Sequence, residues 1–451
     1  MEILDTALSV FFNTMPFLIV ILVALMLWIF SIIGINNPFF TIAMMVFIFL
    51  CETVLMEPFA LNLGLWVYLP DIFVLLVLPS FFYRLIVLNK IRMIPIAWWI
   101  LGVVQLGLFA WGLIANGKAA GVDYRVHFYV WLGAAYLATF NYQEAWAKRF
   151  LIFYTVMGLG VCIIAYYRWV MGAIDYHFYQ ELLRLDATGV GFQRVVASGP
   201  MFMTGCAMLV SLYYVIIDRT KPLAWLLTLL FGLTILAMQH RSVWVATVAG
   251  VMALIWGLSL VRFKVTSKLL SVSFLFAIIL LIVVASGQFS GPLNSIENQY
   301  ISATSTTSGT FVGRVGGWQN LLKLWIDSHS PVTYLVGKPF GGGYEHFEFG
   351  DLGGKRVGQI PHNYYVHLLY RGGLIGLFAF LWVIWRSINV LLSRARRRQD
   401  MVAPLFLAML IAQLVYFIPY ELNYAQMILF GLLLSLITSE KHRLKESKLD
   451  T

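Results

Sequence analysis

A series of long uncharged stretches constrains this chain more than any other feature of its sequence. An α-helix needs about 20 predominantly apolar residues to cross roughly 30 Å of hydrocarbon. We find thirteen candidate stretches, and because several are short, twelve spans also fit the pattern. The candidates lie near residues 10–34, 38–56, 64–83, 94–115, 125–141, 150–171, 197–217, 222–238, 242–260, 268–287, 364–388, 402–418 and 422–438.

The composition agrees with a membrane protein. Hydrophobic types make up 61% of the 451 residues and charged types only 12%, and the mean hydropathy is +0.83. A soluble domain is usually about 45–50% apolar and about 25% charged. These values exclude a soluble globular enzyme, a disordered chain and a nucleic-acid-binding domain. They predict an all-α, polytopic integral membrane protein with about 12–13 transmembrane helices.

The basic residues predict the orientation of the chain in the membrane. Cytoplasmic loops are enriched in Lys and Arg, and 19 of the 31 basic residues fall in one set of alternating connections. We therefore expect these connections, and the C-terminus, to be cytoplasmic. The set comprises Arg84, Lys90, Arg92, Lys148, Arg149, Arg219, Lys221, Arg262, Lys264, Lys268, Arg386, Arg394, Arg396, Arg397, Arg398, Lys441, Arg443, Lys445 and Lys448.

Two long segments face the opposite, outer side and divide the chain. We predict N-terminal transmembrane helices over 1–171, further transmembrane helices with an outer loop at 172–196 over 172–287, a large periplasmic loop over 288–361, and C-terminal transmembrane helices with a cytoplasmic tail over 362–451. Loops of this length are usually functional.

The large loop contains a predicted amphipathic helix near 312–328. Its apolar stripe is formed by residues spaced i, i+3, i+4 and i+7, namely Trp318, Leu321, Leu322 and Trp325. This helix either lies on the membrane surface or covers a site, and both can hold together.

Several familiar catalytic motifs are absent from the sequence. It has no P-loop, no Asp-x-Asp pair, no His/Cys metal cluster and no G-x-S-x-G turn. Chemistry driven by ATP or by a metal-bound nucleotide sugar therefore has no support. We also find no internal repeat and no inverted pair of broken spans, which disfavours a lipid or glycan transporter, the alternative from another functional class.

Polar residues gather instead at the outer ends of the predicted spans. Arg241 interrupts an uncharged run, where a charge is costly unless it meets a partner or a water-filled cavity. It either snorkels from a tight turn or faces a cavity and binds an anion. Arg314 lies at the start of the loop helix and Arg194 at the end of the other outer loop, where each could equally be a solvated or interfacial charge. His362 opens a span, where it is either a capping residue or a general base.

These elements resemble the O-antigen ligase and polymerase family of bacterial inner membranes. The resemblance covers roughly residues 194–388. It rests on the Arg241-Ser242 turn, on Ser308-Gly309 followed by Arg314 and Trp318, on Gly341-Gly342-Gly343, on Pro361-His362-Asn363-Tyr364, and on Arg371-Gly372-Gly373-Leu374-Ile375-Gly376. The Ser-Gly-Arg triplet common in the family is loosened here by inserted residues.

The resemblance implies a periplasmic-face glycosyltransferase of the inner membrane, without metal or nucleotide. The donor would be a glycan on undecaprenyl diphosphate, and the acceptor hydroxyl would belong to a lipid A-core sugar in a ligase or to a growing glycan in a polymerase. We favour the ligase. His362 would be the general base, and Arg241, Arg314 and Arg194 would bind the diphosphate, because arginine binds phosphate oxygens bidentately.

A second group of residues is expected to line the substrate site. It comprises Asn363, Tyr364, Trp318 and Arg371. The aromatic members, with Tyr365 and Trp325, either stack on sugar rings or form an interfacial belt. Arg371 either lines the cavity or pairs with Glu421, which we expect to be a structural turn residue.

Overall fold

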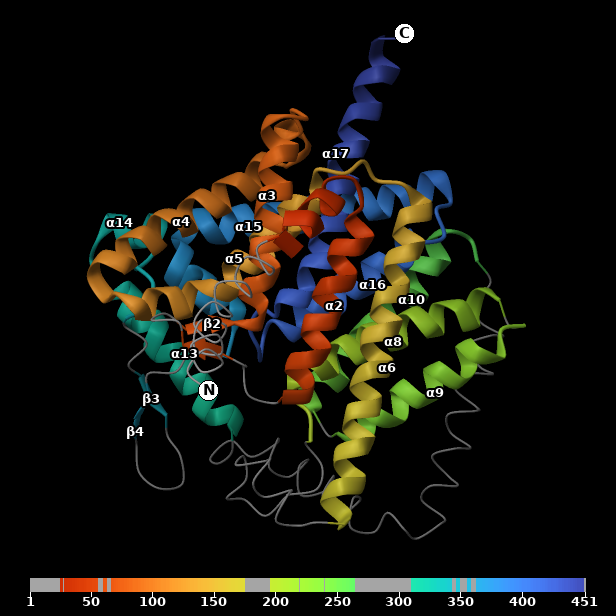
Figure 1. The fold of residues 1–451 in the computed structure, drawn as a ribbon, viewed down its shortest axis with the longest axis horizontal. Coiled ribbons are helices and arrows are strands. Elements are labelled where there is room, and N and C mark those ends of the chain that lie inside the picture. The colour runs from red at the N-terminus through yellow and green to blue at the C-terminus, as the bar shows by residue number, and fades with distance from the viewer. Residues whose placement is uncertain are drawn as a thin grey trace, which may run out of the picture.

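The computed structural model describes residues 25–26, 28–55, 60–62, 66–174, 195–218, 220–238, 240–263, 310–342, 346–348, 355–357 and 362–449. The described part is all-α and polytopic, as predicted (Figure 1). Its α-helices are α2 (Pro38–Leu55), α3 (Leu69–Ile86), α4 (Ile96–Asn116), α5 (Lys118–Ala138), α6 (Glu144–Ile174), α8 (Ser198–Ile217), α9 (Pro222–Ala237), α10 (Arg241–Leu260), α13 (Thr310–Ile326), α14 (Pro331–Val336), α15 (Tyr364–Arg398), α16 (Ala403–Tyr416) and α17 (Met427–Leu449).

Short elements complete the described chain. The 3-10 helices η1 (Ile91–Met93) and η2 (Tyr424–Gln426) precede α4 and α17. Two antiparallel strand pairs are present, β1 (Ala60–Asn62) with β2 (Trp66–Tyr68) and β3 (His346–Glu348) with β4 (Lys355–Val357). Neither pair was predicted from the sequence, because strands of three residues are too short to show a period.

Eleven of the thirteen predicted spans coincide with described helices. The predicted span 268–287 and most of 10–34 lie outside the described residues. By length and composition, seven of the described helices could cross a membrane, namely α2, α3, α4, α6, α8, α10 and α15, and α9, α16 and the first part of α17 are shorter apolar helices. Among the helix starts, the largest shift concerns 125–141, which corresponds to α5 and begins seven residues earlier, at Lys118.

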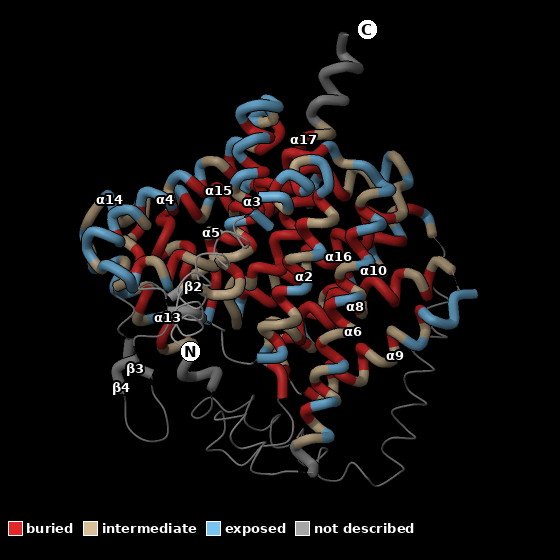
Figure 2. The backbone as a smooth tube through the Cα atoms, in the orientation of Figure 1, coloured by how far each residue is buried: buried red, intermediate tan, exposed pale blue. Residues whose placement is uncertain are grey.

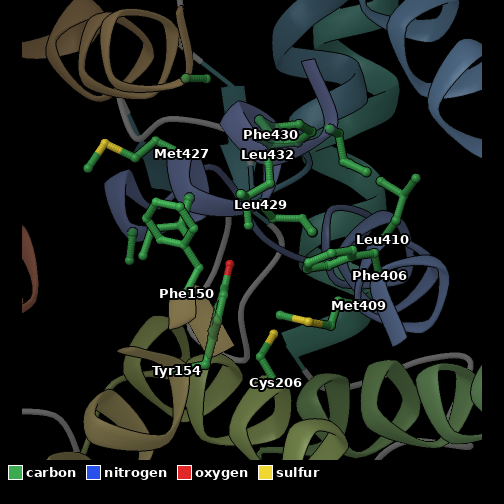
Figure 3. Close-up of a cluster of buried hydrophobic side chains, with 14 of the residues drawn as sticks. Phe150, Tyr154, Cys206, Phe406, Met409, Leu410, Met427, Leu429, Phe430 and Leu432 are labelled. Atoms are coloured by element: carbon green, nitrogen blue, oxygen red, sulfur yellow. The ribbon is translucent and has the colours of Figure 1, made fainter. Parts of the chain in front are cut away.

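The core lies where α8, α10, α16 and α17 meet, and α16 is buried along almost its whole length (Figure 2). Figure 3 shows this packing, in which Cys206 points toward Met409 and Phe406 and Tyr154 points toward Leu429. The outer helices instead leave large apolar side chains exposed. The side chain of Ile114 is 88% exposed and that of Ile96 is 72% exposed. An exposed apolar surface of this kind suits contact with lipid rather than with water.

The basic connections meet at one end of the helix bundle. Arg394 lies with its guanidinium carbon 4.9 Å from the centre of the Tyr142 ring and forms an ion pair of 2.7 Å with Asp400. Thr438 Oγ1 donates a hydrogen bond of 2.8 Å to the carbonyl oxygen of Met93. These contacts therefore join two pairs of the connections that were predicted to share one side of the membrane, the one around 394–400 with the one at 142 and the one at 93 with the start of the C-terminal tail.

The opposite end is held together by buried arginine and histidine side chains. Arg168 donates hydrogen bonds to the carbonyl oxygens of Thr53, Val54 and Val195, which joins the ends of α2 and α6 to the chain that enters α8. His240 Nε2 lies 2.8 Å from the carbonyl oxygen of Val196. These contacts fix where α8 and α10 begin.

Candidate active site

Tyr420 brings together two of the predicted site residues. The Arg314 guanidinium carbon lies 5.1 Å from the centre of the Tyr420 ring, and Arg314 Nη1 donates a hydrogen bond of 3.4 Å to the carbonyl oxygen of Pro419. The His362 ring packs edge-on against the same Tyr420 ring, with 6.2 Å between the ring centres. A permanent cation and an imidazole therefore share one aromatic side chain, although they come from segments about fifty residues apart.

The start of α15 fixes the position of His362. Asn363 is the N-cap of this helix, and its Oδ1 accepts a hydrogen bond of 3.0 Å from the Val366 amide. The Tyr364 amide donates to the carbonyl oxygens of Phe417 and Tyr420, at 3.0 and 3.1 Å. The beginning of α15 is thereby tied to the segment that follows α16. His362 itself is exposed, so its ring is accessible from outside the bundle.

Arg241 lies at the same end of the bundle. It is half-buried and is the first residue of α10, directly after His240, which contacts the chain entering α8. From α8, Ser198 Oγ accepts a hydrogen bond of 3.3 Å from Tyr416, and the Tyr416 ring stacks on Tyr420 with 5.0 Å between centres. The start of α10 is thus linked to Tyr420 through two further elements.

The other expected site residues have different surroundings. Arg194 lies outside the described residues. The predicted loop helix is present as α13, and Leu321 and Trp325 of its apolar stripe pack against Tyr370 of α15. Trp318, on the same helix, is half-buried. The stripe therefore faces the helix bundle, as a covering element would.

Tyr364 and Arg371 are buried inside the protein. The Tyr364 side chain is 2% exposed and packs against Phe417 and Phe380. Arg371 is fully buried and forms an ion pair of 2.9 Å with Asp123 of α5, whereas Glu421 contacts His367 instead. This packing accounts for both side chains without a bound substrate.

A buried ionic network lies next to the Tyr420 segment. We define it as Asp123, His127, His367, Arg371 and Glu421. His367 Nδ1 lies 2.7 Å from Glu421 Oε1, and His367 Nε2 lies 3.9 Å from Asp123 Oδ1. The rings of His127 and His367 contact each other with 4.5 Å between centres. Burial and the nearby Asp123 carboxylate raise the pKa of Glu421, which lies outside the helices, well above its ordinary value.

The network also holds the chain that follows α14. Arg371 donates hydrogen bonds to the carbonyl oxygens of Pro339 and Gly342, the second at 2.7 Å. Asp123 Oδ2 accepts a hydrogen bond of 2.9 Å from the Gly341 amide. The glycine-rich turn of the predicted motif is therefore built around one buried ion pair.

Most of this network, and Tyr420, were not predicted from the sequence. A signal was present, because Asp123 and His127 are spaced i, i+4 on α5, and His367 and Arg371 have the same spacing on α15. Such pairs lie on one face of a helix, and ionisable residues within apolar helices are functional candidates by default. The predicted span 125–141 began too late to include Asp123. For Tyr420 no sequence pattern distinguishes it from other tyrosines at the membrane interface.

The described residues offer no group of three or more His, Cys, Asp or Glu side chains arranged to hold a metal ion. One part of the chain matches a known protein family. Residues 226–381 match the family described as O-antigen ligase, and this match includes Arg241, Arg314 and His362. A search of curated proteins gave no match. From α9 to the first half of α15 the chain is therefore similar to the O-antigen ligase family, which confirms the resemblance.

Proposed function

We propose that this protein transfers a glycan from undecaprenyl diphosphate to an acceptor hydroxyl at the periplasmic face of the bacterial inner membrane. The observation that carries the proposal is the meeting of Arg314 and His362 on the Tyr420 ring, in a chain that is partly similar to the O-antigen ligase family. The family match favours a ligase, with a lipid A-core sugar as the acceptor.

The departing group of this reaction is a lipid diphosphate, which gains negative charge as the glycosidic bond breaks. Arginine stays protonated at any physiological pH and binds phosphate oxygens through paired N–H groups. Arg314 and Arg241 would bind these oxygens, with Arg194 as a further candidate. A well-placed donor to a developing negative charge typically lowers the activation free energy by about 3–4 kcal/mol.

His362 would accept the proton of the acceptor hydroxyl. The hydroxyl oxygen attacks the anomeric carbon, the bond from that carbon to the diphosphate oxygen breaks, and the electron pair of this bond stays on the diphosphate. Attack from the face opposite the leaving group inverts the anomeric carbon. A positioned general base typically contributes about 10²–10⁴-fold to the rate. An exposed imidazole at the end of a span is accessible to an acceptor from outside the membrane.

The test of the proposal is glycan transfer by purified protein with a lipid-linked donor. We expect His362→Ala to lower the turnover by about 10²–10⁴-fold, because the general base is removed. His329→Ala is the matched control, since His329 is an exposed histidine between α13 and α14, away from Tyr420. Normal transfer by His362→Ala would refute the general-base role, whereas no transfer by the unsubstituted protein would favour the transporter alternative.

The choice between ligase and polymerase needs a separate experiment. A strain that lacks a ligase accumulates polymerised glycan on the lipid carrier, whereas a strain that lacks a polymerase accumulates single repeat units. We expect polymerised glycan. Single repeat units on the carrier would show that the protein joins repeats rather than attaching a finished chain.

A further inference from the structure

We propose that Glu421 and His367 are positioning residues that hold the Tyr420 segment, and through it Arg314 and His362, in the arrangement needed for transfer. The Tyr420 segment is defined as residues 417–423, between α16 and η2. The proposal rests on the proposed function for its effect on the rate, while its structural part can be tested without any glycan.

The Glu421–His367 contact lies between two structural elements that both reach the candidate site. Glu421 follows Tyr420 directly, so a bond to its side chain restrains the residue that contacts Arg314 and His362. His367 lies five residues after His362, on the first turns of α15. The 2.7 Å contact therefore joins the segment that carries the shared ring to the helix that begins beside the imidazole.

The backbone between these two points is already tied together. The Tyr364 amide donates to the carbonyl oxygens of both Phe417 and Tyr420. These hydrogen bonds hold the α15 start against the 417–423 segment at one position. The Glu421 side chain holds the two elements together at a second position, which fixes their relative rotation as well as their separation.

The surroundings make His367 a rigid anchor for Glu421. Its side chain is fully buried, and its ring is flanked by the His127 ring at 4.5 Å and by Asp123 Oδ1 at 3.9 Å. Asp123 is in turn fixed by its ion pair with Arg371 and by the Gly341 amide. A buried histidine with contacts on each side has little freedom to follow Glu421 if the segment moves.

Apart from Glu421, whose side chain is 22% exposed, the network lies too deep to hold a substrate itself. Asp123 is 6% exposed and both His367 and Arg371 are fully buried. Buried ionisable groups are costly in the membrane and usually serve a function. Buried groups can instead hold the reacting groups of the site in position. Such positioning matters because displacing reacting groups by about 1 Å can reduce a rate by about 10²-fold.

The experiment compares four substitutions in the full-length protein. Glu421→Ala removes the contact with His367, and Glu421→Asp shortens the side chain by one methylene, which withdraws the carboxylate from His367 at unchanged charge. Glu421→Gln keeps the contact in either histidine tautomer, because an amide is both a donor and an acceptor. Glu440→Ala is the control, since it removes a carboxylate from the ion pair with Arg398 at the other end of the bundle.

Two measurements are made on each purified variant. The first is hydrogen–deuterium exchange of the backbone amides in 362–366 and 417–424, which needs no substrate. The second is glycan transfer, with kcat and KM determined separately. We expect Glu421→Ala and Glu421→Asp to speed exchange in both segments and to lower kcat by about 10²-fold with little change in KM. Glu421→Gln should retain slow exchange and most of the turnover, and Glu440→Ala should change neither.

Unchanged exchange in Glu421→Ala and Glu421→Asp would overturn the proposal, and so would faster exchange with normal kcat. Equal losses in Glu421→Gln and Glu421→Ala would also overturn it, because the hydrogen bond would not be what matters. Absence of transfer by the unsubstituted protein would instead refute the proposed function. In that case the exchange measurement still decides whether Glu421 holds the segment.

Discussion

At the scale of single residues, Tyr420 is the point on which the candidate site depends. Its ring contacts Arg314 and His362, and it stacks on Tyr416, which reaches α8 through Ser198. A cation over an aromatic face is stabilised by the ring quadrupole, by about 0.5–2 kcal/mol depending on desolvation. One neutral side chain can thus hold a cation and an imidazole without neutralising either.

Two substitutions of Tyr420 should distinguish the contribution of its ring to turnover from that of its hydroxyl. We expect Tyr420→Ala to lower kcat by about 10²-fold, because Arg314 and His362 lose their common support. Tyr420→Phe should keep most of the turnover, since the ring contacts remain. Steady-state transfer kinetics on purified variants test this, and a comparable loss in both variants would mean that the hydroxyl takes part instead.

The Asp123–Arg371 ion pair should matter for stability far more than an ion pair near the surface. Removing one partner of a buried pair typically costs about 3–5 kcal/mol, because the other charge is left buried. We therefore expect Asp123→Ala to lower the thermal unfolding midpoint in detergent strongly. Glu144→Gln should have little effect, because the Glu144–Lys148 pair is exposed and exposed pairs contribute about 0–1 kcal/mol. Similar midpoints for the two variants would contradict the role given to the buried pair.

At the scale of elements, the paired glycines after Arg371 have a steric explanation. Gly373 interrupts α15 with φ +58° and ψ −164°, and a Cβ there would lie 2.3 Å from the carbonyl oxygen of Leu335 in α14. Only glycine lacks the Cβ that forbids this backbone conformation. The interruption lets α14 approach α15 closely, and Gly337 faces the same backbone from the other side.

We expect Gly373→Ala to destabilise the protein by at least about 1–3 kcal/mol, the typical cost of a strained backbone conformation. Gly376→Ala is the matched control three residues later in α15, where a Cβ would meet its nearest neighbours at 3.9 Å. Thermal unfolding of both variants in the same detergent compares them. A control variant as unstable as Gly373→Ala would show that α15 rejects any added methyl group.

The elements also show how far the sequence can predict this protein. Hydropathy located α8 and α10 to within a residue at each end, because long apolar runs bounded by charged turns leave little choice. It placed α5 poorly, since Asp123, Arg125 and His127 interrupt the apolar pattern near its start. Those polar residues are satisfied by partners on α3, α4 and α15, and contacts between distant segments are not visible in a single sequence.

The roles of the site residues stay predictions, and the contacts that join two of them were not predicted from the sequence. The motifs identified Arg314 and His362, whereas Tyr420 and Glu421 lie beyond the matched residues 226–381. Their position beside the site follows from the hydrogen bonds of Tyr364 to the 417–423 segment. Only the packing of α15 against the end of α16 reveals that relationship.

At the scale of the whole molecule, the basic end and the candidate site lie at opposite ends of the bundle. The site gathers around the starts of α8, α10 and α15, while the connections rich in Lys and Arg lie where α15 ends and α16 begins. If the basic connections are cytoplasmic, the site faces the periplasm.

Cysteine labelling of intact spheroplasts tests this orientation. His362→Cys and Gln399→Cys place exposed thiols at the candidate site and at the basic end of the bundle, in a background where Cys51 is replaced and the buried Cys162 and Cys206 are kept. A membrane-impermeant maleimide should label position 362 directly and position 399 only after permeabilisation. The reverse pattern would place the candidate site in the cytoplasm.

The central claim is that the guanidinium groups of Arg241 and Arg314, at the outer end of the bundle, bind a lipid diphosphate during glycan transfer. Its most direct test is the turnover of purified Arg241→Lys and Arg314→Lys at saturating donor. Lysine keeps the charge but loses the paired N–H groups, so each variant should lose about 10²–10³-fold in kcat. Arg149→Lys, an exposed arginine over the Phe39 ring at the basic end, should keep its full rate. Full turnover by Arg241→Lys and Arg314→Lys would contradict the account.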